Sequence, residues 1–173
     1  MTLLTAIKGA CPHLGLTVPS AVYASTDREH VELVEIAREA AEDIVDAADW
    51  HTLKTLATIT GDAAAESFAL PSDYLRMPKD QQLWSTAQET PLSHVESHND
   101  WLELDIKAFE LVLRAWTLLG GEVAIKPTLP TAEVVKYYYI SDKAITSSGV
   151  NVSDFAADAD VFRVCPDADR LLK

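Results

Sequence analysis

Two histidines, His94 and His98, are the side chains whose spacing best fits a metal site. Four residues apart on a helix, both imidazoles would lie on one face, as zinc binding requires. A capping-box pattern at Ser93–Glu96 predicts a short helix that ends near Trp101, with Glu96 on its other side. A capped, exposed helix explains the two histidines equally well, so we expect no metal site and no cofactor.

Acidic and aromatic residues raise two further possibilities. Five aspartates near the C-terminus suggest calcium: Asp154, Asp158, Asp160, Asp167 and Asp169. An EF-hand loop, however, needs a glycine at its sixth position and a glutamate at its twelfth, and neither is present. The sequence also lacks the GxxxxGK[ST], GxGxxG, GxSxG and HExxH motifs. Four tryptophans could line a sugar groove, although large aromatics are more often core or interface residues: Trp50, Trp84, Trp101 and Trp116. We therefore predict no catalytic residues.

Composition and charge limit the function further. With 173 residues, of which 48% are hydrophobic and 24% charged, the chain can form one folded domain, or a domain with an arm. Lysine and arginine number 14 against 27 acids, a net charge of −13, which disfavours specific binding of nucleic acid. The apolar start Met1–Ala10 is interrupted by Lys8 and is too short for a signal peptide or membrane span. Cys11 and Cys165 have no CxxC spacing. We expect a soluble, unexported protein that contacts no membrane.

Two helices are predicted at the N-terminus, over residues 2–14 and 27–49. Apolar residues recur at helical spacing in the first until Gly15 ends it, and a capping box at Thr26–Glu29 opens the second. One side of this long amphipathic helix is apolar: Leu33, Ile36, Ala37, Ala40, Ile44, Ala47 and Ala48. The other side carries an acidic stripe at steps of three and four: Glu32, Glu35, Glu39, Glu42 and Asp46. The stripe is either a solvated helix face or a surface that faces a partner or a channel.

The remainder of the chain is typical of an antiparallel sheet followed by an arm. Alternating and β-branched residues predict strands at about 53–60, 109–117, 121–126 and 133–140. The last three form a meander that turns at Gly120–Gly121. After Ser141 the composition shifts to Ser, Asp and Ala, so we expect residues 141–173 to form an extended C-terminal arm beside a core of residues 1–140. The predicted fold class is α+β.

Several landmarks, taken in order, resemble the head-to-tail adaptor proteins of tailed bacteriophages. They begin with LLTAIKGACPHLGL, a Pro-Ser-Ala-Val loop at residues 19–22, and a long helix that closes on Trp50 before LKTLATIT. Further on come LPSDY at residues 70–74 with Arg76, then Trp84, then Gly121 leading into VAIKP. YYYIS at residues 137–141 precedes the acidic arm. The resemblance extends from Met1 to about Phe162.

The resemblance implies a structural virion protein, not an enzyme, similar in role to the tail accessory factor of short-tailed phages. Such head-tail connector, or neck, proteins form a homo-oligomeric ring, expected to be a dodecamer, that binds the portal protein and extends the DNA channel. A downstream tail or nozzle protein would be the other partner, and DNA would only pass through during ejection. The protein would be assembled in the host cytoplasm and reside in the neck of the virion.

Two groups of residues would carry this role. The acidic stripe would face the lumen, where it would repel phosphates and prevent the channel from gripping DNA. The arm would dock on a neighbouring protein through Phe155, Val161 and Phe162. Three other functions remain open: a tail completion or terminator protein on the tail side, a cell-wall hydrolase-like enzyme with acids and tryptophans in a cleft, and a small acidic binding module of the host cell.

Overall fold

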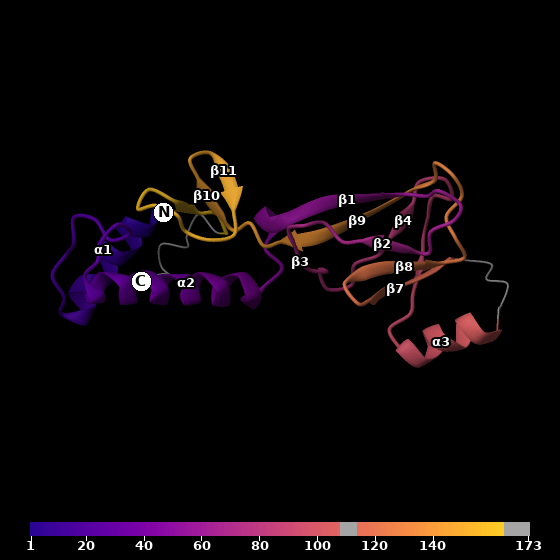
Figure 1. The fold of residues 1–173 in the computed structure, drawn as a ribbon, viewed down its shortest axis with the longest axis horizontal. Coiled ribbons are helices and arrows are strands. Elements are labelled where there is room, and N and C mark those ends of the chain that lie inside the picture. The colour runs from indigo at the N-terminus through magenta and orange to yellow at the C-terminus, as the bar shows by residue number, and fades with distance from the viewer. Residues whose placement is uncertain (108–113, 165–173) are drawn as a thin grey trace. The chain divides into compact units, whose positions relative to one another are not determined.

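The computed structural model describes residues 1–107 and 114–164, which form an α+β fold (Figure 1). The chain folds into two compact units. Unit 1 combines residues 1–54 with the chain from residue 140 onward, and unit 2 is the continuous stretch 55–139. This division differs from the expected one, a core of residues 1–140 with a separate arm, because residues 141–164 fold together with the N-terminal helices.

Helix α1 spans Leu3–Leu14 and opens unit 1. The Thr2 hydroxyl caps its first turn by accepting a hydrogen bond from the backbone N–H of Thr5 at 3.2 Å. Gly15 ends it in the left-handed region, with φ 71°, where a residue without a Cβ is favoured. The helix buries one face, formed by Leu3, Ala6, Ile7 and Cys11. Its bounds agree with the predicted 2–14 to within one residue.

Helix α2 spans Arg28–Ala47, shorter at both ends than the predicted 27–49. Its N-cap is Asp27, without a side-chain capping bond, so the predicted capping box does not form. The helix buries Leu33, Val34, Ala41 and Val45. The predicted apolar side was partly wrong, because Ile36 and Ala47 are exposed. Val34, Ala41 and Val45 continue the apolar surface of Leu33 and Ala37 around the helix. The buried face is therefore centred on a side of α2 that does not include Ile36.

The rest of unit 1 is built from short elements. The 3-10 helix η1 spans His51–Leu53, and three strands follow much later: β10 (Ile145–Ser147), β11 (Val150–Val152) and β12 (Val161–Phe162). They form an antiparallel sheet in the order β11-β10-β12. Ser148 and Gly149 turn the β10–β11 hairpin with φ of 49° and 83°, as a two-residue type I′ turn requires. The predicted extended arm is therefore wrong for residues 141–164, and residues 165–173 lie outside the described part.

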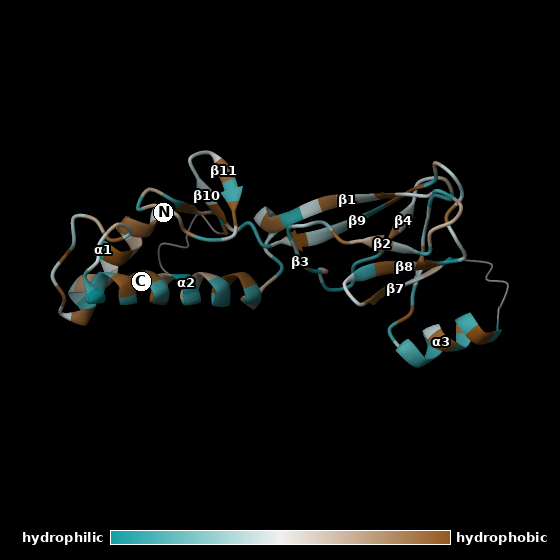
Figure 2. Cartoon of the chain, in the orientation of Figure 1, coloured by the Kyte–Doolittle hydropathy of each residue, from teal (hydrophilic) through white to brown (hydrophobic). Residues whose placement is uncertain are grey.

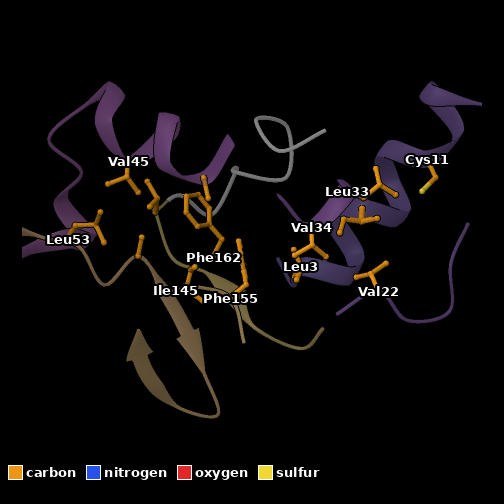
Figure 3. Close-up of a cluster of buried hydrophobic side chains, with 14 of the residues drawn as sticks. Leu3, Cys11, Val22, Leu33, Val34, Val45, Leu53, Ile145, Phe155 and Phe162 are labelled. Carbon is orange, nitrogen blue, oxygen red and sulfur yellow. The ribbon is translucent and has the colours of Figure 1, made fainter. Parts of the chain in front are cut away.

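Residues 1–4 pair with residues 158–162 inside unit 1. The N–H of Leu3 donates to the carbonyl of Asp160 at 2.9 Å, and the N–H of Phe162 donates to the carbonyl of Met1 at 3.1 Å. Thr2 and Val161 form the antiparallel bridge between these bonds. Phe155 and Phe162 thereby enter a buried cluster with Leu3, Val34 and other residues of both helices (Figure 3). The C-terminal segment completes the core that the two helices begin.

Unit 2 is made of two sheets and one helix. Its elements are β1 (Lys54–Thr60), β2 (Ser67–Ala69), β3 (Tyr74–Arg76), β4 (Trp84–Ser85), β5 (Thr90–Pro91), β6 (Ser93–His94), α3 (His98–Lys107), β7 (Ala115–Leu119), β8 (Glu122–Lys126) and β9 (Val134–Ser141). One sheet has the order β1-β9-β4-β5, with β3 also on β9, and the other has the order β2-β8-β7-β6. Trp116 and Ile125 of the second sheet share a buried cluster with Val135 and Tyr137 of the first. The two inner faces thus form the core of unit 2.

The predicted strands agree with the structure in three of four positions, at β1, β8 and β9. The strand predicted at 109–117 begins at Ala115 in the described part, and residues 109–113 lie outside it. Strands β7 and β8 form the expected hairpin at Gly120–Gly121. The expected meander was wrong, because β9 pairs with β1, β3 and β4. Val135 and Tyr137 of β9 pack against residues of β8 across the core of unit 2. Strand β9 therefore belongs to the sheet opposite β8 and does not pair with it.

The carboxylate of Asp160 stabilises the C-terminal segment of unit 1. Asp160 is 2% exposed, and its Oδ2 accepts the N–H groups of Ala156 at 2.5 Å and Ala157 at 2.8 Å. Burial raises the pKa of this carboxyl, but hydrogen bonds from Ser147 and from those two N–H groups outweigh burial, so the net pKa is lowered. The ionised form of Asp160 is therefore favoured in the folded state.

We predict that Asp160→Ala lowers the free energy of unfolding by about 1–3 kcal/mol, because it removes a buried carboxylate and leaves two part-buried N–H groups unsatisfied. Folding lowers the pKa of Asp160, so the ionised carboxylate adds to the free energy of unfolding. This stabilisation is fully present above the unfolded pKa of about 3.9 and is lost as pH falls through the lower folded pKa. Urea unfolding from pH 7 to pH 2 should show a stability gap between the wild type and Asp160→Asn that closes below about pH 4. The exposed Asp43→Asn is the control, and an equal gap for both variants would contradict the assignment.

Candidate interaction surfaces

The acidic stripe of α2 lies on the solvent side of that helix. All five predicted residues are exposed: Glu32, Glu35, Glu39, Glu42 and Asp46. They lie opposite the buried face of Leu33, Ala37 and Ala41, as the helical period requires. Figure 2 shows hydrophilic and hydrophobic residues on different sides of α2. We call this exposed side of α2 the acidic face.

The two arginines of α2 are both held by carboxylates. Arg28 Nε lies 2.6 Å from Glu32 Oε1. Arg38 pairs with Glu35 and, at 2.8 Å from its Nε, with Oδ1 of Asp154. Partial burial lowers the pKa of Arg38, but the charges and hydrogen bonds of Asp154 and Glu35 outweigh it and raise the pKa. Seven acids stand against these two arginines between Arg28 and Ala47, so the helix remains strongly negative.

A polyanion gains nothing by contacting such a face. Binding of DNA is driven largely by lysines and arginines that replace counterions on the phosphates, and the acidic face offers only two arginines, each already paired. Its field is felt within about 8 Å at physiological salt. Chemically, the acidic face can border a DNA strand without holding it.

The outer face of the first sheet of unit 2 carries a groove of about 490 Å³. Along β9, Val135, Tyr137 and Tyr139 are buried, so Lys136 and Tyr138 point to the other side. Trp84 of β4 is the cross-strand partner of Lys136. The groove is lined by residues of β1, β4, β9 and the segment before β4: Leu56, Asp80, Gln81, Gln82, Trp84, Lys136, Tyr137 and Tyr138.

Three large apolar side chains of this groove are half-exposed: Leu56 (49%), Trp84 (48%) and Tyr138 (51%). Aromatic side chains exposed together on a sheet mark interaction surfaces more often than exposed single residues do. The lining holds one basic residue, Lys136, and one acidic residue, Asp80. This groove was not predicted from the sequence. The alternation in β9 points Tyr138 outward, but only the β4–β9 register brings Trp84 beside it.

Two of the three predicted docking residues are not available to a partner. Phe155 and Phe162 are each 3% exposed and belong to the core of unit 1, whereas Val161 is 37% exposed. The prediction was wrong for both phenylalanines because backbone pairing with Met1–Leu4 draws them onto α1 and α2. Deleting residues 141–173 would therefore open this core.

The two histidines considered as a metal pair do not share a helix. His94 lies in β6, where its ring stacks on Trp116 at 4.2 Å between centroids, and α3 begins only at His98. Among residues 1–107 and 114–164, no group of three or more His, Cys, Asp and Glu side chains is arranged to hold a metal ion. Among the same residues, no helix has the length and apolar character needed to cross a membrane.

The C-terminal aspartates and most tryptophans have structural roles. Asp154 forms an ion pair with Arg38. Asp158 accepts hydrogen bonds from backbone N–H groups of the loop before α2, and Asp160 accepts one from the N–H of Ala156 in the turn that precedes it. Asp167 and Asp169 lie outside the described residues. Trp101 and Trp116 are buried, and Trp50 donates its Nε1–H to the carbonyl of Ile44 at 2.5 Å. Trp84 alone of the four tryptophans lines the groove described above.

No protein-family model matches the chain, and no curated protein matches it significantly in sequence.

We predict that Glu39→Lys/Glu42→Lys creates weak DNA binding without unfolding the protein. Both side chains are exposed, so stability should change by less than about 0.5 kcal/mol, whereas the net charge rises from −13 to −9. Affinity for duplex DNA at low salt should rise about tenfold and fall steeply as salt is added. Fluorescence anisotropy of labelled DNA measures this change.

Glu96→Lys/Glu122→Lys is the matched control, since it makes the same change of net charge at exposed positions of unit 2. Equal DNA affinity in the two variants would show that net charge alone matters and that the acidic face has no special role.

Proposed function

We propose that the protein is a structural virion subunit that forms a ring between the portal and the tail of a tailed bacteriophage and extends the DNA channel. The observation that carries the proposal is the acidic face of α2, whose seven acids are exposed opposite the buried side and whose two arginines are already paired. The order of the sequence landmarks from Met1 to about Phe162 supports it, as does the α+β fold.

In this role Glu32, Glu35, Glu39, Glu42 and Asp46 line the lumen. DNA leaving the head must slide past many copies of the protein, and any basic wall would hold it by counterion release. A wall of carboxylates removes that attraction. Repulsion from all sides also keeps the duplex away from the wall.

The charge of the chain constrains ring assembly. Each copy carries −13, so identical copies repel one another until a favourable contact offsets the repulsion. Added salt weakens such repulsion, and a portal ring that binds each copy would gather them at one place. We expect a dodecamer that forms on the portal, with a downstream tail or nozzle protein on its other side.

We predict that light scattering of this protein mixed with the cognate portal ring detects a defined complex, whose mass exceeds that of the portal by many copies of an 18.9 kDa chain. The protein alone should remain much smaller at low salt, because its copies repel. A complex with purified tail tubes instead of the portal would move the role to the tail side, as a completion or terminator protein. A monomer in every mixture would contradict the proposal.

A second experiment tests the lumen. Phage particles that carry Glu39→Lys/Glu42→Lys should assemble with normal composition and eject DNA more slowly than the wild type, because the wall then attracts phosphates. Particles with the control Glu96→Lys/Glu122→Lys should eject normally. Normal ejection by both variants would show that the acidic face lies outside the channel.

A further inference from the structure

Helix α3 lies on the outer side of the second sheet of unit 2 (Figure 1). Side chains alternate along a strand, so Ala115 of β7 and Ala124 of β8 point away from the core between the two sheets. Trp101 of α3 packs on these two alanines, and all three side chains are buried. We call Ala115 and Ala124 the seat of Trp101.

The apolar contact of α3 with the sheet is small. Among the ten residues of the helix, all of which the structure describes, only Trp101 is buried. Leu104 is partly buried in the same cluster, whereas Leu102 and Ile106 are 53% and 74% exposed. An element with few buried contacts opens at a lower free energy than the core that it covers. Helix α3 therefore depends on Trp101 and on the polar contacts near it.

An ion pair joins α3 to the sheet beside the seat. Lys126 of β8 points to the same side as Ala124, and its Nζ pairs with Oδ1 of Asp105. Asp105 lies one helical turn after Trp101, on the same face of α3. The Nζ of Lys126 is also 5.7 Å from the centroid of the Trp101 ring, within cation–π range. Lys126 thus contacts both residues through which α3 meets the sheet.

The ammonium of Lys126 has a second carboxylate partner, outside α3. Oε2 of Glu66 lies 3.6 Å from Nζ of Lys126. Glu66 is fixed beside β8, because its carbonyl accepts the N–H of Ile125 at 2.8 Å. When Asp105 moves away, Lys126 keeps this acidic partner, so its charge is not left unpaired. The contact with α3 can therefore break without the large cost of isolating a buried charge.

We propose that α3 is a flap that opens from the second sheet while both sheets stay folded, and that the Asp105–Lys126 pair is its latch. On opening, Trp101 leaves its seat, and the outer side of β7 and β8 becomes accessible. On closing, Trp101 regains the two alanines and Asp105 regains Lys126. This motion involves unit 2 alone and does not depend on the neck role.

Cysteine labelling measures the opening. Ala124→Cys places a thiol in the seat, and Ala57→Cys places one in the core between the sheets, at 8% exposure against 4%. The full chain carries Cys165→Ser, and peptide mass spectrometry separates each site from the remaining Cys11. Under native conditions the seat thiol should react at least about tenfold faster than the core thiol. Ala115→Cys, a second seat probe, should do the same, and equal rates for seat and core would overturn the flap.

Urea distinguishes opening of α3 from unfolding of unit 2. The rate of a labelling reaction rises with urea in proportion to the surface that must be exposed first. Because opening of α3 exposes less surface than unfolding, low urea should accelerate labelling of Ala124→Cys less steeply than that of Ala57→Cys. Equal slopes would show that the seat opens only when unit 2 unfolds, which would also overturn the flap.

Two substitutions in α3 test the latch. Asp105→Asn removes the contact with Lys126, whereas Glu103→Gln removes the same charge from the same helix but breaks only a pair with Lys107 of α3 itself. Asp105→Asn should accelerate labelling of Ala124→Cys about two- to fivefold, as expected for a partly exposed ion pair. Glu103→Gln should accelerate it by less than about twofold. No acceleration by Asp105→Asn, or an equal one by Glu103→Gln, would overturn the latch.

Discussion

Unit 1 depends on the pairing of residues 1–4 with residues 158–162. The carbonyl of Asp160 accepts the N–H of Leu3, and the buried carboxylate of the same residue organises the turn that precedes β12. This turn places Phe155 and Phe162 in the core against α1 and α2. With one side of α2 fixed on that core, the other side, with its seven acids, is left to solvent. The acidic face of α2 is thus positioned by buried contacts on the opposite side of the helix.

The sequence predicted α1, β1, β8 and β9 well because the signals of these elements are local. Helical spacing and Gly15 defined α1, and alternation defined β1, β8 and β9 to within one residue. The segment 141–164 was misjudged because its aspartates suggested solvent, whereas Asp158 and Asp160 bind backbone N–H groups. Composition cannot show that an acid will be satisfied by the main chain, and the partners of Asp158 lie more than 130 residues earlier in the sequence.

The groove of unit 2 shows a different limit. Alternation in β9 assigns Tyr138 to the outer side, but the strand could have paired with β8, as the expected meander required. Its actual neighbours β1 and β4 follow from the packing of Val135 and Tyr137 against the second sheet. Leu56 and Trp84 lie near Tyr138 only because β9 pairs with β1 and β4. Predicting a surface made by several strands therefore requires knowing how distant strands pair. The acidic face could be predicted because all its residues belong to one helix.

The order of synthesis has a consequence for unit 1. Unit 2 is one uninterrupted stretch, 55–139, and can fold as soon as it leaves the ribosome. Helices α1 and α2 emerge before unit 2 but must wait for Phe155 and Phe162, which follow unit 2 in the sequence, before their apolar sides are covered. The loop that carries Val18 and Tyr23 is fixed by Asp158 at the same late moment. A nascent chain therefore cannot hold this loop in its final form before Asp158 has been synthesised.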